Sequence, residues 1–205
     1  MKSINHFLIE PIGSRYDNEV EVGDKKLIVN SEIQNHEYVN RCARVLVCPA
    51  LNTTSIREGD EIIVHHNVFR RWYDVKGKEK NSKAYFKDNT YLVSLDQIFL
   101  IKKNTRHTRR KDPFWMCVDG FSFVQPIKYN TNIELNEKED PYKGVIIYSD
   151  GSTNVGDLVG YTPFSKYEFV INGKRLYRVY NKFITIKYEY QGNEETYNPS
   201  WAQSS

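Results

Sequence analysis

The sequence predicts an all-β protein in which one small barrel-like module occurs twice in tandem. Fifteen Tyr and ten Phe stand among many Val, Ile and Thr, residues that suit a pleated, half-buried surface. Short apolar runs are bounded by Gly, Pro, Asn and Asp, a pattern typical of sandwiches and barrels. A Gly-Asp pair precedes an apolar run at two places. The 205 residues suffice for one ordinary domain or two small ones.

The expected strands follow these apolar runs along the chain. In the first half we expect strands at residues 26–30, 43–48, 61–65, 84–86, 91–94 and 98–101. In the second half we expect them at residues 121–125, 144–148, 158–161, 167–171, 174–179 and 184–188. The stretch "INGK", residues 171–174, has Asn-Gly between two alternating runs, which predicts a hairpin.

The flanks of the two Gly-Asp pairs indicate an internal duplication. "ARVLVCP" precedes Gly59-Asp60 and "KGVIIYS" precedes Gly156-Asp157, and each reads as a strand that ends in a turn. Further on, residues 91–101 and 176–186 superimpose without a gap, which matches Val93 with Arg178 and Ile98 with Phe183. Repeated order and spacing of this kind predict a copied unit.

The two Gly-Asp pairs are expected to be structural turns rather than catalytic groups. Glycine supplies the positive φ that a turn into a strand requires. Aspartate bonds the backbone of its own turn. We therefore assign Gly59, Asp60, Gly156 and Asp157 to structural turns and expect no catalytic residue and no enzyme activity.

The boundary between the copies is expected in the polar segment 102–113, which carries six basic residues. The sequence thus predicts a first module at 1–103, a basic linker at 104–113, a second module at 114–192 and a flexible tail at 193–205. A solvated linker is the preferred interpretation of the basic cluster; phosphate binding or a nuclear address stays open. Because no aromatic residues are interleaved in this cluster, nucleic acid is not an expected partner.

Cysteine and histidine usage predicts no metal site and no cofactor. Cys42, Cys48 and Cys117 are expected to be small buried hydrophobic residues, since their number and spacing fit neither a disulfide framework nor zinc. His65 and His66 are expected on a strand with one ring inward and one outward. The polar N-terminus and the lack of a long apolar run predict a cytoplasmic protein without a membrane segment.

The order of elements resembles the GroES-type co-chaperonin family, the small β-barrel that caps a chaperonin ring. In that family a "G-x-V-x-x-V" strand precedes a "V-G-D-x-V" strand, and a segment like "D-I-L-A-I" ends the module. The matching residues here are Val45, Val47, Gly59, Asp60, Ile62 and 96–101 in the first copy, and Gly144, Val145, Gly156, Asp157 and Val159 in the second. The resemblance covers most of residues 25–101 and 121–186, and it implies two tandem GroES-like, partly open β-barrels. Two modules in one chain are similar to tandem chloroplast co-chaperonins, and bacteriophages also encode relatives of this family.

The resemblance also implies where a partner would bind. Family members contact the chaperonin through a mobile loop after the first strand, which here corresponds to residues 31–41 and 129–143. The expected chaperonin-binding residues in these loops are Ile33, Tyr38, Val39, Ile133 and Leu135. The alternative is that these residues anchor a surface loop on its own barrel.

The resemblance implies a homo-oligomeric ring that caps a GroEL-type chaperonin and assists ATP-dependent folding, with ATP hydrolysis left to the partner. If such a dome forms, the short segments 49–58 and 149–155 predict an open apex. The alternative function is a structural or assembly component of a virion, built on the same barrels without a chaperonin.

Overall fold

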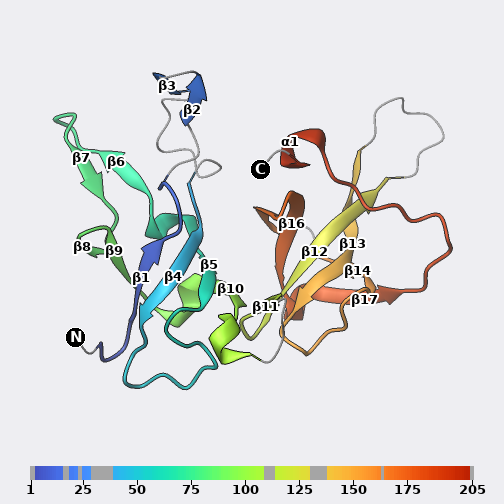
Figure 1. Ribbon diagram of the computed structural model, residues 1–205. Helices are drawn as coiled ribbons and strands as arrows, with labels where there is room; N and C mark the ends of the chain where they lie inside the picture. Colours follow the sequence, from blue (N-terminus) through green and yellow to red (C-terminus); the bar gives the residue numbers. More distant parts are fainter. Residues whose placement is uncertain are drawn as a thin grey trace. The chain divides into compact units, whose positions relative to one another are not determined.

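The computed structural model describes residues 3–15, 19–22, 25–28, 39–108, 114–129, 138–162 and 164–203, with the backbone alone for 19–22 and 25–28. The chain divides into two compact units, Met1–Trp115 and Met116–Ser205, drawn from blue to green and from yellow to red in Figure 1. Within the described ranges, helix is limited to α1 (Ser200–Gln203) and short 3-10 turns. The prediction of an all-β protein is therefore confirmed.

The first unit is organised around the strands β10-β5-β4-β1-β9-β8 of a seven-stranded sheet, whose seventh strand, β11, spans the boundary between the units. These strands are β1 (Phe7–Pro11), β4 (Cys42–Val47), β5 (Glu61–Val64), β8 (Tyr85–Lys87), β9 (Thr90–Val93), β10 (Ile98–Lys102) and β11 (Trp115–Cys117). Two separate hairpins join β2 (Glu19–Val22) to β3 (Lys25–Ile28) and β6 (Arg71–Tyr73) to β7 (Glu79–Asn81).

The second unit contains a six-stranded antiparallel sheet in the order β15-β16-β12-β13-β14-β17. Its strands are β12 (Phe121–Lys128), β13 (Glu139–Ser149), β14 (Leu158–Tyr161), β15 (Tyr167–Ile171), β16 (Lys174–Tyr180) and β17 (Ile184–Tyr188). The predicted "INGK" hairpin joins β15 to β16, with Asn172 and Gly173 at φ values of 52° and 69°. In the described part of the chain, neither this sheet nor that of the first unit closes into a barrel.

The two sheets repeat one topology strand for strand. β1, β4, β5, β8, β9 and β10 correspond to β12, β13, β14, β15, β16 and β17, both in chain order and in the order of neighbours across the sheet. The bulges recur as well, between Leu8 and Ile9 in β1 and between Phe123 and Val124 in β12. Two sheets of the same connectivity and irregularity in one chain are what a copied unit produces.

The packing cores also correspond. A cluster of six buried side chains in the second unit has a buried counterpart for each member in the first. The six are Val124, Ile146, Val159, Tyr161, Tyr177 and Val179, and their counterparts, in the same order, are Ile9, Val45, Ile62, Val64, Tyr91 and Val93. Equivalent strands thus bury equivalent positions, although most of the residues differ.

This correspondence corrects the alignment of 91–101 with 176–186, which is one residue out of register. Tyr91 pairs with Ile9 on β1, and the residue that pairs with the equivalent Val124 on β12 is Tyr177, not Leu176. Because successive side chains of a strand point to opposite faces, a shift of one residue exchanges inside for outside. The sequence alignment set buried Val93 against Arg178, whereas the structure sets it against buried Val179.

The Gly59 and Gly156 turns have the same geometry in both units. Gly59 has φ 86° and Gly156 has φ 92°, in the region that favours glycine. The Gly59 N–H donates to the Val45 carbonyl at 2.7 Å, and the Gly156 N–H donates to the Ile146 carbonyl at 2.8 Å. Each turn therefore returns the chain onto the preceding strand at the same position of the sheet.

The segment expected to be a basic linker and the segment expected to be a flexible tail both form hydrogen bonds with the units. In the segment expected to be a linker, residues 104–108 contain a 3-10 turn (Thr105–His107), and the Asn104 N–H donates to the Asp60 carboxylate at 2.9 Å. The tail expected to be flexible runs beside β12, where the Tyr197 N–H donates to the Pro126 carbonyl at 2.8 Å. The backbone groups at this end of β12 need partners, and the tail supplies them.

His65 and His66 do not lie on a strand. The chain leaves β5 at Val64 and enters a 3-10 turn (His66–Val68), in which the His65 Nδ1 accepts from the Asn67 N–H at 3.1 Å. A histidine in this position caps the turn in the way that Asn or Asp caps a helix.

Candidate partner-binding connections and the adjoining pocket

The two segments predicted as mobile loops occupy equivalent connections of the repeated sheet. Residues 31–41 belong to the connection from β1 to β4. Of the second segment, residues 129–138 belong to the connection from β12 to β13, and residues 139–143 belong to β13. Of the predicted contact residues, Ile33, Tyr38, Ile133 and Leu135 lie outside the described residues. The structure does describe the bases from which both connections leave the sheets.

Asn40 closes the base of the first connection. Its Nδ2 donates to the carbonyls of Ile12 and Ser14 at 2.6 and 2.7 Å, and its Oδ1 accepts from the Cys42 N–H at 2.8 Å. The Asn40 N–H also donates to the Arg15 carbonyl at 3.0 Å. One buried amide therefore ties the outgoing chain to the returning chain and satisfies backbone groups on both.

Val39 belongs to this closed base rather than to an exposed arm. Its side chain is only 3% exposed, directly beside buried Asn40. A side chain at this depth contacts a partner only if the base opens. The burial of Val39 fits the alternative interpretation, in which apolar residues of the loop anchor it on its own module.

The second connection leaves a two-stranded ribbon formed by the ends of β12 and β13. Lys128 pairs with Glu139, and the Tyr129 N–H donates to the Lys138 carbonyl at 2.8 Å. Part of the predicted loop, residues 139–143, is therefore strand. The sequence does not reveal that β13 begins at Glu139, because Glu139 and Asp140 are charged residues that are typical of a loop.

Glu139 holds the base of this ribbon through a cluster of charged and aromatic groups. Its carboxylate accepts from the Tyr177 hydroxyl at 2.7 Å and pairs with Lys166 at 2.8 Å and with Arg175 at 3.0 Å. Burial, together with the hydrogen bond to Glu139, raises the pKa of Tyr177 well above its ordinary value. Tyr177 thus stays a neutral donor, and the cluster joins β13, β16 and the residue that precedes β15 by side chains.

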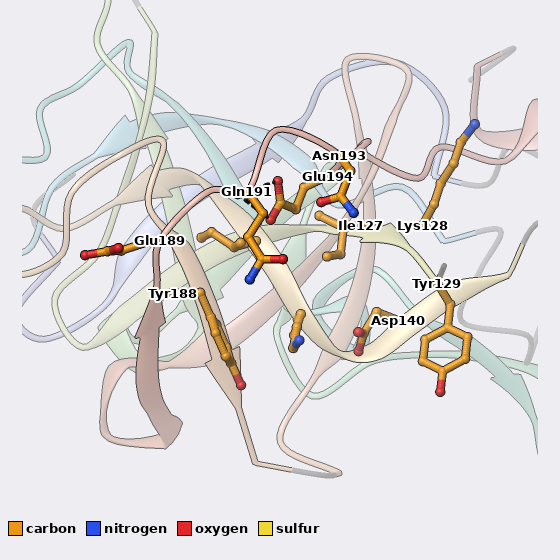
Figure 2. Close-up of a pocket in the computed structure, with 11 residues that line it drawn as sticks. Ile127, Lys128, Tyr129, Asp140, Tyr188, Glu189, Gln191, Asn193 and Glu194 are labelled. Atoms are coloured by element: carbon orange, nitrogen blue, oxygen red, sulfur yellow. Dashed lines mark hydrogen bonds between the residues drawn. The ribbon is translucent and has the colours of Figure 1, made fainter. Parts of the chain in front are cut away.

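A pocket of about 250 Å³ lies against the base of the second connection (Figure 2). Its wall combines the ends of β12 and β13 with the segment that follows β17. It is lined by Ile127, Lys128, Tyr129, Asp140, Lys143, Leu158, Tyr188, Glu189, Gln191, Asn193 and Glu194. Both charge signs are present, and no lining residue was a predicted site residue, because the pocket depends on the docked tail.

The polar groups of the pocket are engaged within the protein. The Asp140 carboxylate accepts from the Tyr142 N–H at 2.9 Å, and the Glu194 carboxylate accepts from the N–H groups of Gln191 and Gly192 at 2.9 Å. Lys143 places its ammonium 4.5 Å from the centre of the Tyr188 ring. These contacts order the wall of the pocket. They do not form a catalytic arrangement, in which a nucleophile is hydrogen-bonded to a base and a third group orients that base.

The aspartates of the two structural turns differ in their surroundings. The Asp60 side chain is fully buried and accepts from the Arg57 N–H at 2.9 Å, so it bonds its own turn, and it also pairs with Lys103 and His107 at 3.1 and 3.2 Å. Asp157 is partly exposed and pairs with Lys187 at 2.8 Å. Both arrangements have the form of structural ion pairs.

All three cysteines are free thiols. Cys117 is buried, and burial raises the pKa of its thiol well above the ordinary value, while Cys42 and Cys48 are partly exposed. Within the residues that the structure describes, no group of three or more His, Cys, Asp or Glu side chains lies together as a metal site.

Comparison with known proteins adds no relative: no protein-family model and no curated protein matches the chain. Among the described residues, no helix has the length and apolar character needed to span a membrane.

Proposed function

We propose that this chain is a co-chaperonin-like cap for a chaperonin ring, in which each unit is a partly open GroES-like β-barrel. In the cytoplasm it would close the folding chamber and assist ATP-dependent folding, while the partner hydrolyses ATP. The proposal rests on the resemblance of the repeated motifs to the GroES-type family. It is supported by the way those motifs are placed in the fold.

One observation carries the proposal. The same six-strand topology occurs twice, and each copy has a long connection at the same point, between its first and second core strands. The resemblance puts the chaperonin-binding arm at this connection in both units. A protein that needed one ligand site would gain nothing from two such arms, whereas a ring-shaped cap gains a contact from each module.

Ring formation is supported by the open ends of the second sheet. β15 and β17 end this sheet, and Ile186 on β17 is 50% exposed. Unpaired edge strands offer N–H and C=O groups to another chain. We propose that these edges join neighbouring subunits into a homo-oligomeric ring.

In the resembled family the arm becomes ordered only on contact with the chaperonin, which keeps binding reversible, and we extend this property of the family to the two connections. Ordering a chain segment costs conformational entropy, which lowers affinity without removing specificity. A cap that leaves in each folding cycle needs this balance. The closed bases at Asn40 and Glu139 would limit the ordering to the outer parts of the connections, near Ile33, Tyr38, Ile133 and Leu135.

A second candidate function is favoured by the burial of Val39. If the first connection is a loop anchored on its own module rather than a chaperonin-binding loop, the same modules suit a structural or assembly component of a virion without a chaperonin partner. The experiment below separates the two functions.

The test combines the full chain with a GroEL-type chaperonin, with and without ATP, and follows co-migration and limited proteolysis. The proposal predicts co-migration only with nucleotide, together with protection of residues 31–41 and 130–143. The double variants Ile33→Ala/Tyr38→Ala and Ile133→Ala/Leu135→Ala are expected to weaken binding at least about tenfold, as expected when apolar anchors of an interface are truncated.

A matched control is Val155→Ala, which removes an apolar side chain that is 65% exposed and lies outside both connections. It should bind as well as the unmodified chain. No co-migration with any nucleotide, combined with association of the chain with virus particles, would favour the structural function instead.

A further inference from the structure

The first unit carries an insertion that the second unit lacks. Between β5 and β8 the chain runs through residues 65–84 and builds the β6–β7 hairpin, whereas the equivalent connection from β14 to β15 consists of residues 162–166. The second sheet forms without such a hairpin (Figure 1). The insertion is therefore not a requirement of the repeated fold.

The inserted hairpin and the neighbouring β8 expose aromatic side chains. Trp72 and Tyr73 on β6 are 44% and 49% exposed, and Phe86 on β8 is 44% exposed. Trp72 and Tyr73 are adjacent in the strand, so they point to opposite faces of the hairpin. Exposed Trp and Tyr side chains on an insertion that the repeated fold does not require indicate a surface available to a partner, and Phe86 lies beside it on β8, a strand of the repeated sheet.

The same segment is strongly basic. Residues 70–88 contain four more basic than acidic residues, whereas the formal net charge of the whole chain is +3. Its acidic side chains are largely neutralised internally, since Glu79 pairs with Arg71 at 3.3 Å and Asp74 pairs with Lys80 at 3.7 Å. The cations of Lys76, Lys78 and Lys83 pair with no carboxylate of the described part of the chain.

The base of the hairpin is held firmly, so the surface is presented in a defined position. Arg15 donates to the Phe69 carbonyl at 2.8 Å and to Asn81 Oδ1 at 2.8 Å. The Ser82 hydroxyl donates to the Val68 carbonyl across the two arms of the insertion. Across the hairpin itself, Trp72 pairs with Lys80, so the two side chains lie on the same face of the hairpin.

We propose that this aromatic–basic hairpin, residues 70–87, binds single-stranded nucleic acid. Its rings would stack on bases and its lysines would contact phosphates, the two features that bind single strands with little dependence on sequence. A protein partner would also suit Trp, Tyr and Arg, but lysine is depleted in protein–protein interfaces. The same segment contains five lysines, at positions 76, 78, 80, 83 and 87, so the composition favours phosphates.

The test titrates fluorescein-labelled oligo(dT) of about 20 nucleotides with the full chain and measures fluorescence anisotropy and quenching of tryptophan emission. The inference predicts binding that weakens roughly tenfold or more between about 50 and 200 mM salt, because counterions are released from the phosphates. Trp72→Ala/Phe86→Ala should weaken binding at least about tenfold, since each stacked base contributes substantially. Lys76→Glu/Lys78→Glu should weaken binding and also flatten its salt dependence.

Matched controls remove the same kinds of group from the second unit. Phe164→Ala deletes a fully exposed ring, and Lys174→Glu reverses an exposed charge. Both should bind as the unmodified chain does. Absence of binding at low salt, or equal losses in the hairpin and control variants, would overturn the inference. Equal competition by polyglutamate would also overturn it and identify an acidic protein as the partner.

Discussion

Asp60 and Asp157 occupy the same position of the repeated turn but contribute differently to stability. The Asp60 side chain is 0% exposed and pairs with Lys103 and His107, whereas Asp157 is 22% exposed and pairs with Lys187, itself 64% exposed. A buried carboxylate with several donors is costly to disturb, while an exposed pair contributes little. The shared Gly-Asp motif thus determines the conformation of the turn, and the surrounding residues determine how much the aspartate contributes to the stability of the protein.

Replacing each aspartate by asparagine tests this difference directly. Asp60→Asn is expected to lower the free energy of unfolding by about 3 kcal/mol, since it replaces a fully buried carboxylate that accepts from the Arg57 and Asn104 N–H groups and pairs with Lys103. Asp157→Asn is the matched control and should cost less than about 1 kcal/mol. Equilibrium urea denaturation of the two variants measures both values; equal losses would contradict the assignment.

The same pair of variants reports the pH dependence of stability. Burial acts to raise the pKa of Asp60, but hydrogen bonds from the Asn104 and Arg57 N–H groups and from His107 outweigh it. The net effect holds the pKa of Asp60 below its ordinary value of 3.8. Its contribution is therefore present above about pH 4 and is lost as the pH falls through the folded-state pKa. The difference in stability between the unmodified chain and Asp60→Asn should shrink over that range.

At the scale of elements, Gly144 determines how closely β12 and β13 approach. A Cβ at this position would overlap the Gln125 carbonyl oxygen and lie 2.6 Å from Val124 Cγ1. Gly144→Ala is therefore expected to destabilise the chain by roughly 1–3 kcal/mol through overpacking. The equivalent residue in the first unit is Ala43, so Ala43→Gly is a matched control without overpacking, in which the loss of a buried methyl group from a strand costs about 1 kcal/mol. Thermal or urea denaturation would check this; an unaffected Gly144→Ala would show that the strands separate without cost.

The C-terminal segment acts as a further element of the second unit. Thr196 forms a bridge with Ile127, the Lys128 N–H donates to the Glu195 carbonyl at 2.7 Å, and Asn198 bonds Gly173 at 2.9 Å. Truncation after residue 192 should lower the free energy of unfolding by about 2–4 kcal/mol, the sum of several backbone hydrogen bonds. The tail was expected to be flexible, and that expectation predicts no change on truncation.

A control for the truncation is Trp201→Ala, which removes a ring that lies 5.6 Å from the Arg175 guanidinium and is 51% exposed. It leaves the backbone pairing intact and should cost less than about 1 kcal/mol. A larger loss in Trp201→Ala than in the truncation would show that the ring, not the backbone pairing, holds the tail.

The sequence predicted most core strands because their apolar runs and turn residues are local signals. β14, β15 and β17 were predicted with the observed bounds. β1 was missed, although "LIEPI" at residues 8–12 matches "FVQPI" at residues 123–127 in the equivalent strand. A shared Pro-Ile pair was the available signal, and a comparison of the N-terminal stretch with the second copy would have found it.

Other features depend on contacts that no local pattern encodes. The one-residue register error arose because polar and aromatic residues alternate on both faces of β16, so two alignments look equally good. β6 and β7 are rich in charge and were not recognised, since an exposed hairpin has no buried face to mark it. The docking of the tail depends on pairing between residues that are far apart in the sequence, and the pocket beside the tail depends on that docking. The contacts of Asp60 with Lys103 and His107 also join distant parts of the sequence.

At the scale of the whole molecule, the duplication links fold to proposed function. Two copies of one topology preserve six equivalent core positions, while the connections and insertions differ between the copies. Core positions are buried in both units, whereas the segments outside the sheets differ between the units. This divergence is consistent with the proposals that the connections bind a partner and that the inserted hairpin binds nucleic acid.

The capping function is tested most directly by refolding a client protein that a chaperonin folds only inside its closed chamber. The chain is added to the chaperonin, ATP and the denatured client in place of a co-chaperonin, and the yield of active client is recorded. The account predicts that folded client rises well above the yield with chaperonin and ATP alone. A yield that stays at that level, while a GroES-type protein restores folding in the same mixture, would contradict it.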